Sequence, residues 1–536
     1  MSVSTTDTTL DGMLAAHATA RPGDAALVLP TGVVGGMRTV TFGALQRRVE
    51  AAAAGLLAAG VGPGTRTALL VPPIDDFFVL AYALLRVRAV PVVVDPGIGL
   101  ARVRDCLGEA APEAFVGIAK AHLARRVLHW CPDARLAVTA GPVPVPRTTS
   151  LRRLERDGAR RGPREPEPRP DGAPAAILFT SGSTGPPKGV EHHESGLLAQ
   201  AGLIRDLYGL GPGDVSLATF PPFALFGPAL GMTTVVPRMD PTRPAKVVPS
   251  RLVHAAQRSG ATVMFGSPAL LDRLGRGAPA GTRIPWLRQI ISAGAPVPRE
   301  TQRRVLALLG PGAQVHTPYG ATEALPVASI GSDELLALPD DGICVGRPVP
   351  GVDVALMRVS DGPVDTLTPD RLVAPGEVGE VVVRGPVVSP AYADRPEATA
   401  AAKLRWDGRL AHRTGDLASA DAEGRLWFAG RVAHVVHTAD GPLHSVPCEE
   451  VLNHHPAVRR CALVGVGQTP VVVVEMLAGS RLTVEVSDEL RALAAADTRT
   501  RAITTLLEHP ALPVDPRHNS KIDREALGRW ATRELA

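Results

Sequence analysis

Aromatic residues are scarce in this chain, where phenylalanine, tryptophan and tyrosine together make up 4% of 536 residues. Apolar residues nevertheless make up 45%, so the hydrophobic cores must be built mainly from aliphatic side chains. The length exceeds that of one ordinary domain, and we expect two or more. The 54 glycines and 51 prolines exceed ordinary usage, but they stay below the level that indicates disorder.

Cysteine, net charge and long apolar runs are also limited. The cysteines number five and contain no CxxC pair, namely Cys106, Cys131, Cys344, Cys448 and Cys461. This pattern argues against a zinc site or a disulfide framework and fits a reducing compartment. The net charge of +4 is small and scattered, which argues against a nucleic-acid partner. The start of the chain lacks a signal-peptide pattern, and no apolar run reaches membrane-spanning length. We therefore expect a cytoplasmic protein without an integral membrane segment.

Helical and strand-like patterns alternate along most of the chain. Residues 41–60 predict a helix opened by Thr41, and a buried strand and a second helix follow it. The alternation returns between residues 249 and 320. Such an order implies a parallel sheet covered by helices. Residues 141–174, rich in proline and arginine, are predicted to be a surface connection, whereas residues 342–385 show shorter, more strand-like segments.

A segment rich in glycine and hydroxyl residues follows the strand predicted at residues 175–180. It reads LFTSGSTGPPKG over residues 178–189. Small residues let backbone amides approach a ligand, and hydroxyls with a single lysine suit phosphate oxygens. A P-loop of the GxxxxGK[ST] type is excluded, because Lys188 is followed by Gly189 rather than by serine or threonine. The segment therefore predicts a phosphate-binding loop of another kind.

This segment resembles the phosphate loop of the adenylate-forming superfamily, which includes acyl-CoA synthetases, luciferases and the adenylation domains of peptide synthetases. Taken alone, each later motif has an ordinary interpretation, such as a helix cap, a turn or a solvated lysine. Their order and spacing favour the family instead. These motifs are SAGAPV at 292–297, YGATE at 319–323, RTGDL at 413–417, GRVAH at 430–434 and NSKIDR at 519–524.

The resemblance implies a site for ATP and Mg²⁺. Tyr319 would stack on adenine, Thr322 would contact the phosphoryl end, and Asp416 would accept hydrogen bonds from the ribose. Thr184 and Glu323 would hold Mg²⁺, a hard cation that takes few protein ligands beside substrate phosphates. The implied nucleotide contacts are Thr180, Ser181, Gly182, Ser183, Thr184, Gly185, Lys188, Gly294, Ala295, Pro296, Tyr319, Gly320, Ala321, Thr322, Asp416 and Arg431. The implied catalytic residues are Thr184, Lys188, Glu323 and Lys521.

The resemblance also implies a mixed α/β and α+β architecture. A large N-terminal domain, residues 1–430, would consist of α/β subdomains and a small barrel-like part. A smaller α+β lid, residues 431–536, would carry Lys521 and rotate between two half-reactions. The first half-reaction would join a carboxylate to ATP, giving acyl-AMP and pyrophosphate.

The segment after Arg431 departs from the pattern of ligases that use a thiol in the second half-reaction. The usual Gly-Gly turn is reduced to ADGPLHS at residues 439–445, and Ala433 stands at the hinge position. FPPFALFGPALGM, residues 220–232, stands where many ligases have a histidine-bearing aromatic segment. These features resemble the β-lactone synthetases of head-to-head olefin and β-lactone natural-product pathways. In that branch an activated β-hydroxy acid closes on itself, and intramolecular attack exploits a high effective molarity.

Three hypotheses follow. The leading one is an ATP-dependent β-lactone synthetase acting on a β-hydroxy fatty acid. The second is a fatty-acyl-AMP or acyl-CoA ligase. The third, a non-catalytic nucleotide-binding or scaffold subunit, is disfavoured by the retained motif residues. Large hydrophobic intermediates also suggest hand-off from pathway enzymes, although no motif names one.

Two groups of residues near these motifs leave their interpretation open. An apolar channel for the acyl chain is one interpretation of the aromatic segment, and ordinary core packing is nearly as good for the same side chains: Phe220, Phe223, Leu225, Phe226 and Met232. His192 and His193 follow the phosphate loop closely. We expect them to be surface or cap residues rather than catalysts.

Overall fold

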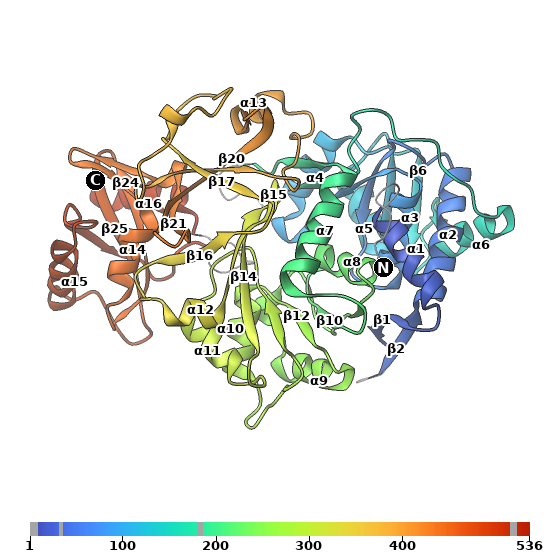
Figure 1. Ribbon diagram of the computed structural model, residues 1–536, viewed down its shortest axis with the longest axis horizontal. Helices are drawn as coiled ribbons and strands as arrows, with labels where there is room; N and C mark the ends of the chain where they lie inside the picture. Colours follow the sequence, from blue (N-terminus) through green and yellow to red (C-terminus); the bar gives the residue numbers. More distant parts are fainter. Residues whose placement is uncertain (1–8, 32–35, 180–185, 515–521) are drawn as a thin grey trace.

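The computed structural model describes residues 9–31, 36–179, 186–514 and 522–536. Two large sheets and a smaller one organise these residues, with helices packed around them (Figure 1). The chain enters through α1 (Leu10–Ala20), which packs against α2 (Phe42–Ala58) and α8 (Pro221–Ala229).

The first large sheet is parallel except at one edge. Its spatial order is β7 (Thr149–Ser150), β6 (Leu136–Ala140), β5 (Ala114–Ile118), β3 (Arg66–Leu70), β4 (Val90–Val93), β8 (Ala176–Phe179) and β9 (Gly189–His192). Helices α3 (Asp75–Arg86), α4 (Leu100–Ala110) and α5 (Ala119–Leu128) connect its parallel strands. The predicted helix after Thr41 is confirmed as α2, and the Thr41 side chain accepts a hydrogen bond from the Ala44 amide. Only β9 runs antiparallel to its neighbour, β8.

Residues 141–174 are more than a surface connection, and that prediction was wrong. They contain β7 and the helix α6 (Leu151–Arg161), whose first turn is capped by the Ser150 hydroxyl. Close packing of α6 on α2 depends on two glycines. A Cβ at Gly55 would lie 2.3 Å from the Leu154 carbonyl oxygen, and one at Gly158 would lie 1.9 Å from the Ala51 carbonyl oxygen. The short apolar stripe of α6 is hidden in the sequence by its many arginines.

The second large sheet has 14 strands, which are mainly parallel in one half and antiparallel in the other. Strands β13 (Gln289–Ile291), β12 (Val263–Phe265), β10 (Val215–Ala218), β11 (Thr233–Val235) and β1 (Ala25–Pro30) are parallel, and β2 (Met37–Thr41) closes that end. At the other end β14 (Gln314–Ala321) pairs parallel with β13 and antiparallel with β15 (Ala324–Gly331). The change of direction places the β14–β15 connection beside the carboxyl ends of the parallel strands.

Antiparallel strands complete this sheet beyond β15. They are β16 (Ile343–Pro348), β21 (Leu426–Arg431), β20 (Arg409–Ala420), β18 (Gly379–Arg384) and β17 (Asp353–Met357), and β19 (Lys403–Trp406) also pairs with β20. The strand-like character predicted for residues 342–385 is confirmed. The surrounding helices are α7 (Glu194–Tyr208), α9 (Pro249–Ser259), α10 (Pro268–Gly277), α11 (Arg299–Leu306), α12 (Ser332–Ala337) and α13 (Pro396–Ala402).

A small unit follows β21 and has its own apolar core. Its sheet consists of β24 (Val458–Val466), β25 (Thr469–Met476) and β26 (Thr505–Glu508), with the hairpin β22 (Val436–Thr438) and β23 (Gly441–Leu443) before it. Helices α14 (Ser445–Asn453), α15 (Val484–Ala496) and α16 (Arg524–Leu535) belong to the same unit, drawn in orange to red at one end of the molecule (Figure 1). The predicted mixed fold is thus confirmed as a large N-terminal and a small C-terminal part.

Two further observations concern the whole described chain. All five cysteines are buried thiols. Within the described residues, every helix is too short or too polar to cross a membrane.

Candidate active site

A cleft of about 2130 Å³ contains the predicted site residues that the structure describes. Its walls include the end of the phosphate loop, the SAGAPV and YGATE segments, the middle of β20 and the end of β21. The predicted residues that line it are Lys188, Gly294, Ala295, Pro296, Tyr319, Gly320, Ala321, Thr322, Glu323, Asp416 and Arg431. Thr180, Ser181, Gly182, Ser183, Thr184, Gly185 and Lys521 lie outside the described residues.

Asp416 is held between two side chains from different strands. The Tyr319 hydroxyl donates a hydrogen bond of 2.8 Å to Asp416 Oδ2, and Arg431 Nε lies 3.0 Å from Asp416 Oδ1. Asp416 and Arg431 face each other in the β20–β21 pairing, which explains the second contact. Burial and the adjacent Asp416 carboxylate raise the pKa of Tyr319, so the phenol stays a hydrogen-bond donor. The arrangement presents an oriented carboxyl acceptor to the cleft.

A buried ion pair fixes the strand that carries Asp416. Arg413 Nη2 lies 2.7 Å from Glu380 Oε2, and the two side chains are 9% and 3% exposed. Arg413 also donates to the carbonyl oxygens of Ser360 at 2.9 Å and Gly362 at 2.7 Å. Because its remaining hydrogen bonds are made to backbone, Arg413 serves the structure rather than the cleft.

Glu323 lies in the connection between β14 and β15, and not at the start of a helix. It is 9% exposed, and the Tyr392 hydroxyl donates to its Oε1 at 2.7 Å. Lys188 Nζ lies 4.8 Å from the centre of the Tyr392 ring. A carboxylate has a second oxygen to offer, so Glu323 fits the hard oxygen ligand that Mg²⁺ requires.

Three buried basic side chains belong to this part of the fold, and two of them, Lys403 and His412, were not identified in the sequence analysis. Lys403 Nζ lies 3.1 Å from Ser389 Oγ and 6.0 Å from the centre of the Tyr392 ring, and burial lowers its pKa to about 7. Burial likewise lowers the pKa of His412 well below its usual value and that of His192 to about 4. These shifts keep both imidazoles neutral at neutral pH.

The expectation that His192 lies at the surface is wrong, since the side chain is only 3% exposed. Strand β9 places Val190 and His192 on one buried face, because residues two apart share a face. His193 occupies the position before the first turn of α7, which agrees with its interpretation as a cap residue.

The aromatic segment forms α8 and one wall of the cleft. Phe220, Phe223, Leu225 and Phe226 line the cleft, and the Phe223 ring stacks on Phe265 with centroids 4.3 Å apart. Met232 is 4% exposed and belongs to the apolar core. Core packing is therefore the correct interpretation for Met232, while the other four side chains leave an apolar surface facing the cleft.

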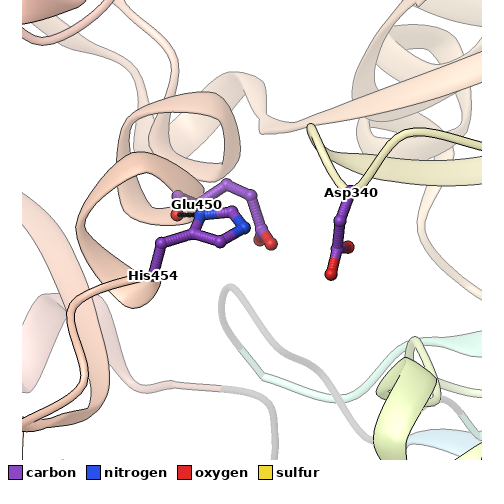
Figure 2. Close-up of side chains that lie close together, drawn as sticks. All are labelled: Asp340, Glu450 and His454. Carbon is purple, nitrogen blue, oxygen red and sulfur yellow. Dashed lines mark hydrogen bonds between the residues drawn. The ribbon is translucent and has the colours of Figure 1, made fainter.

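A second group of possible metal ligands lies between the large and small parts. Figure 2 shows Asp340, Glu450 and His454, whose ligand atoms all lie within 4.8 Å of one another. Asp340 already pairs with Arg299 Nε at 2.7 Å, and His454 Nδ1 donates to the Glu450 carbonyl oxygen at 2.7 Å. Asp340 and His454 are exposed, and no other feature of the described residues indicates an ion at this place.

The fold and the motif positions together define an adenylate-forming enzyme. Residues 14–393 match the family described as AMP-binding enzyme. The chain therefore belongs to this family, as its motifs predicted.

Two relatives align over nearly the whole chain. An olefin beta-lactone synthetase of Stenotrophomonas maltophilia is 47% identical over 512 residues, which cover 93% of this chain and 92% of the relative. An olefin beta-lactone synthetase of Xanthomonas campestris pv. campestris is 46% identical, with coverage of 92% and 91%.

Solved structures share the fold. An amide bond synthetase from Marinactinospora thermotolerans superposes with a TM-score of 0.79 at 25% identity, covering 97% of this chain and 99% of that chain. An O-succinylbenzoate coenzyme A synthetase from Bacillus subtilis, solved with ATP and a magnesium ion, gives a TM-score of 0.74 at 20% identity, covering 96% and 98%.

Proposed function

We propose that this chain is an ATP-dependent β-lactone synthetase. It would activate a β-hydroxy fatty acid as acyl-AMP with release of pyrophosphate, and the β-hydroxyl would then close the ring and release AMP. The observation that carries this proposal is the 47% identity over 93% of the chain with an olefin beta-lactone synthetase. The arrangement of the cleft supports it.

The nucleotide would bind across the cleft between the two parts of the molecule. Tyr319 would stack on adenine and Asp416 would accept from the ribose hydroxyls, while Gly294, Ala295 and Pro296 would line the adenine pocket. Lys188 and Thr322 would contact phosphate oxygens, and Arg431 would contact the nucleotide from the junction of the two parts. Glu323 and Thr184 would hold Mg²⁺, which supplies charge stabilisation for attack at the α-phosphorus. In-line attack of a carboxylate needs mainly positioning and electrostatic stabilisation, which Lys521 would complete.

We further propose that the C-terminal unit, residues 431–536, is a mobile lid and that residues 1–430 form the domain to which it closes. The antiparallel strands β16 to β21 would correspond to the small barrel-like part. In the present arrangement Arg499 of the C-terminal unit lies 2.9 Å from Asp341 of the large part. That exposed pair would have to break if the lid rotates, at a cost of about 0–1 kcal/mol.

The segment after Arg431 supports an internal nucleophile, the β-hydroxyl of the substrate, in the second half-reaction. This segment forms a short 3-10 turn and the hairpin β22–β23, whose turn is formed by Ala439 and Asp440 instead of a Gly-Gly pair. The phenylalanines of α8 would accommodate the acyl chain. A substrate that carries its own hydroxyl needs no tunnel for an external thiol.

Product analysis tests the proposal. The protein is incubated with ATP, Mg²⁺ and a β-hydroxy fatty acid, with and without coenzyme A, and the products are identified by mass spectrometry and NMR. A β-lactone formed at equal rates in both samples is expected. Thioester formation from plain fatty acids, without any lactone, would instead assign the chain as an acyl-CoA ligase.

A further inference from the structure

His192 is a buried imidazole at the edge of the cleft, and one of its two ring nitrogens lacks a hydrogen bond among the described residues. Its Nε2 is inaccessible to solvent and makes no hydrogen bond within the described part of the chain, while the residue contributes to the lining of the cleft. An unsatisfied buried polar group costs about 1–3 kcal/mol. Such a group indicates either strain or a partner that arrives with a ligand.

Strand pairing places His192 on the sheet face that carries Tyr392, whose hydroxyl donates to Glu323. Val190 pairs with Tyr392 in an antiparallel bridge, and the Glu191 amide donates to the Ala391 carbonyl oxygen at 3.0 Å. Residues directly opposite each other share a face of the sheet, and so do residues two apart on one strand. His192 therefore lies on the face that carries Tyr392. The positive charge of Lys403 also acts on the His192 imidazole.

One strand partner of His192 is apolar and belongs to the core cluster that also includes part of α8. Ala176 pairs with His192 across β8 and β9, and Leu197 lies one turn into α7. Both belong to the buried cluster against which Phe223 and Phe226 pack. His192 lines the same cleft as Glu323, Tyr392 and the phenylalanines of α8. A β-hydroxyl, separated from its carboxyl by only two carbons, would be bound in this cleft beside the carboxyl group.

We propose that His192 is the catalytic base of the second step, a role that rests on the proposed function above. A ring nitrogen takes the proton of the β-hydroxyl, whose oxygen forms a bond to the carboxyl carbon. The bond between that carbon and the phosphate oxygen of AMP breaks, and AMP leaves with the electron pair. The imidazolium then returns its proton to water, so the enzyme is regenerated without any other reactant.

His192 is in the neutral form that a base requires, and its low pKa makes it a weak base until a negative charge arrives nearby. Burial first, and then the charges of Lys403 and His193, lower its pKa to about 4, so the ring is neutral and holds a free lone pair at neutral pH. The negative charge on the departing AMP stabilises the imidazolium as it forms. Because the imidazole is neutral, the apolar substrate does not have to bind next to a positive charge on His192.

The test separates the two half-reactions in His192→Gln, with His193→Gln as the matched control. Single-turnover reactions with ATP, Mg²⁺ and a β-hydroxy fatty acid are quenched, and pyrophosphate, acyl-AMP and β-lactone are each quantified. In His192→Gln we expect one equivalent of pyrophosphate at the wild-type rate, accumulation of acyl-AMP, and lactone formation slowed about 10²–10⁴-fold. In His193→Gln both rates should stay at wild-type values, because His193 lies outside β9 and only precedes α7.

Three outcomes overturn the proposal. Lactone formation at the wild-type rate in His192→Gln shows that the imidazole is dispensable. An equal loss of pyrophosphate release and lactone formation in a folded variant assigns His192 to structure or to adenylation. A wild-type protein that releases pyrophosphate but makes no lactone contradicts the proposed function, and the base with it.

A second variant keeps the test decisive if His192→Gln does not fold. His192→Ala leaves a space in which added imidazole can replace the lost ring. Recovery of lactone formation with imidazole, at an unchanged rate of pyrophosphate release, supports the base. Absence of recovery in folded His192→Ala, or an equal stimulation of His193→Ala by imidazole, overturns it.

Discussion

The Tyr319 hydroxyl donates a hydrogen bond of 2.8 Å to the Asp416 carboxylate, joining two motifs that lie 97 residues apart. Arg431 contacts the same carboxylate from the neighbouring strand at 3.0 Å. The orientation of Asp416 is therefore set by the fold before any nucleotide binds. Preorganisation of this kind reduces the ordering that binding would otherwise require.

Asp416→Ala should weaken ATP binding about 10²–10⁴-fold, because hydrogen bonds from two ribose hydroxyls are lost. Hydrogen bonds to a charged acceptor are worth roughly 1.5–3 kcal/mol each, and a difference of about 1.4 kcal/mol is tenfold in Kd. Isothermal titration with ATP measures the change. Asp407→Asn is a suitable control, since its carboxylate is 74% exposed and pairs with Arg384. A wild-type Kd in Asp416→Ala would remove the ribose assignment.

Glu323→Gln should raise the Mg²⁺ concentration needed for half-maximal pyrophosphate release by tenfold or more. The amide keeps the size of the side chain but lacks the charge that a hard cation prefers. Tyr392→Phe is the matched control, because it removes the hydrogen bond to Glu323 and leaves the carboxylate in place. We expect only a small effect there. Equal Mg²⁺ dependence in Glu323→Gln and the wild type would show that the ligand lies elsewhere.

Lys521→Ala should slow pyrophosphate release about 10²–10³-fold and leave the Kd for ATP unchanged. Removal of one preorganised group that stabilises the developing charge typically lowers the rate by this factor. Stopped-flow pyrophosphate detection and ATP titration measure the two quantities separately. Lys246→Ala, at an exposed lysine, controls for loss of a positive charge. Undiminished release in Lys521→Ala would contradict the lid assignment.

Glu380→Gln should destabilise the large part by about 3–5 kcal/mol, since it leaves the Arg413 guanidinium buried without its carboxylate. Thermal and urea unfolding followed by tryptophan fluorescence measure the loss. Asp407→Asn, which breaks an exposed pair, should cost at most about 1 kcal/mol. Similar unfolding midpoints for the two variants would show that the buried pair contributes no more than the exposed one.

Local patterns predicted much of the fold. The helix over Phe42–Ala58 followed from the Thr41 cap and a regular apolar stripe, because both signals act within a few residues. In α6 the stripe is reduced to Leu151 and Leu154 among arginines, and the packing depends on Gly158 meeting the distant residue Ala51. A contact between residues so far apart produces no pattern in the local sequence, and residues 141–174 were therefore interpreted as a surface connection.

Site residues that belong to family motifs could be predicted from the sequence. Site residues whose position depends on the pairing of distant strands could not. Tyr319 and Asp416 were assigned to one site by family resemblance, although no local pattern in the sequence shows that they touch. The burial of His192 depends on β9 pairing with β8 and with Tyr392, and the sequence alone does not reveal these partners. The same holds for Lys403, whose position beside Tyr392 comes from a contact between separate segments.

The last prediction is that fatty acids without a β-hydroxyl stall as acyl-AMP. Activation needs only the carboxylate, the nucleotide site and the lysine assigned to the lid, so pyrophosphate release should approach one equivalent per enzyme and then nearly stop. Ring closure needs a nucleophile on the substrate, and intramolecular attack gains up to about 7–11 kcal/mol over a bimolecular step. Without the hydroxyl, only slow hydrolysis of the bound adenylate remains, and coenzyme A should not accelerate it. Paired incubations with a fatty acid and its β-hydroxy analogue of equal length, followed by quantitation of AMP, acyl-AMP and lactone, measure this directly. Rapid multiple turnover of the plain acid with coenzyme A would mean that a thiol does reach the adenylate, and the internal-nucleophile mechanism would be abandoned.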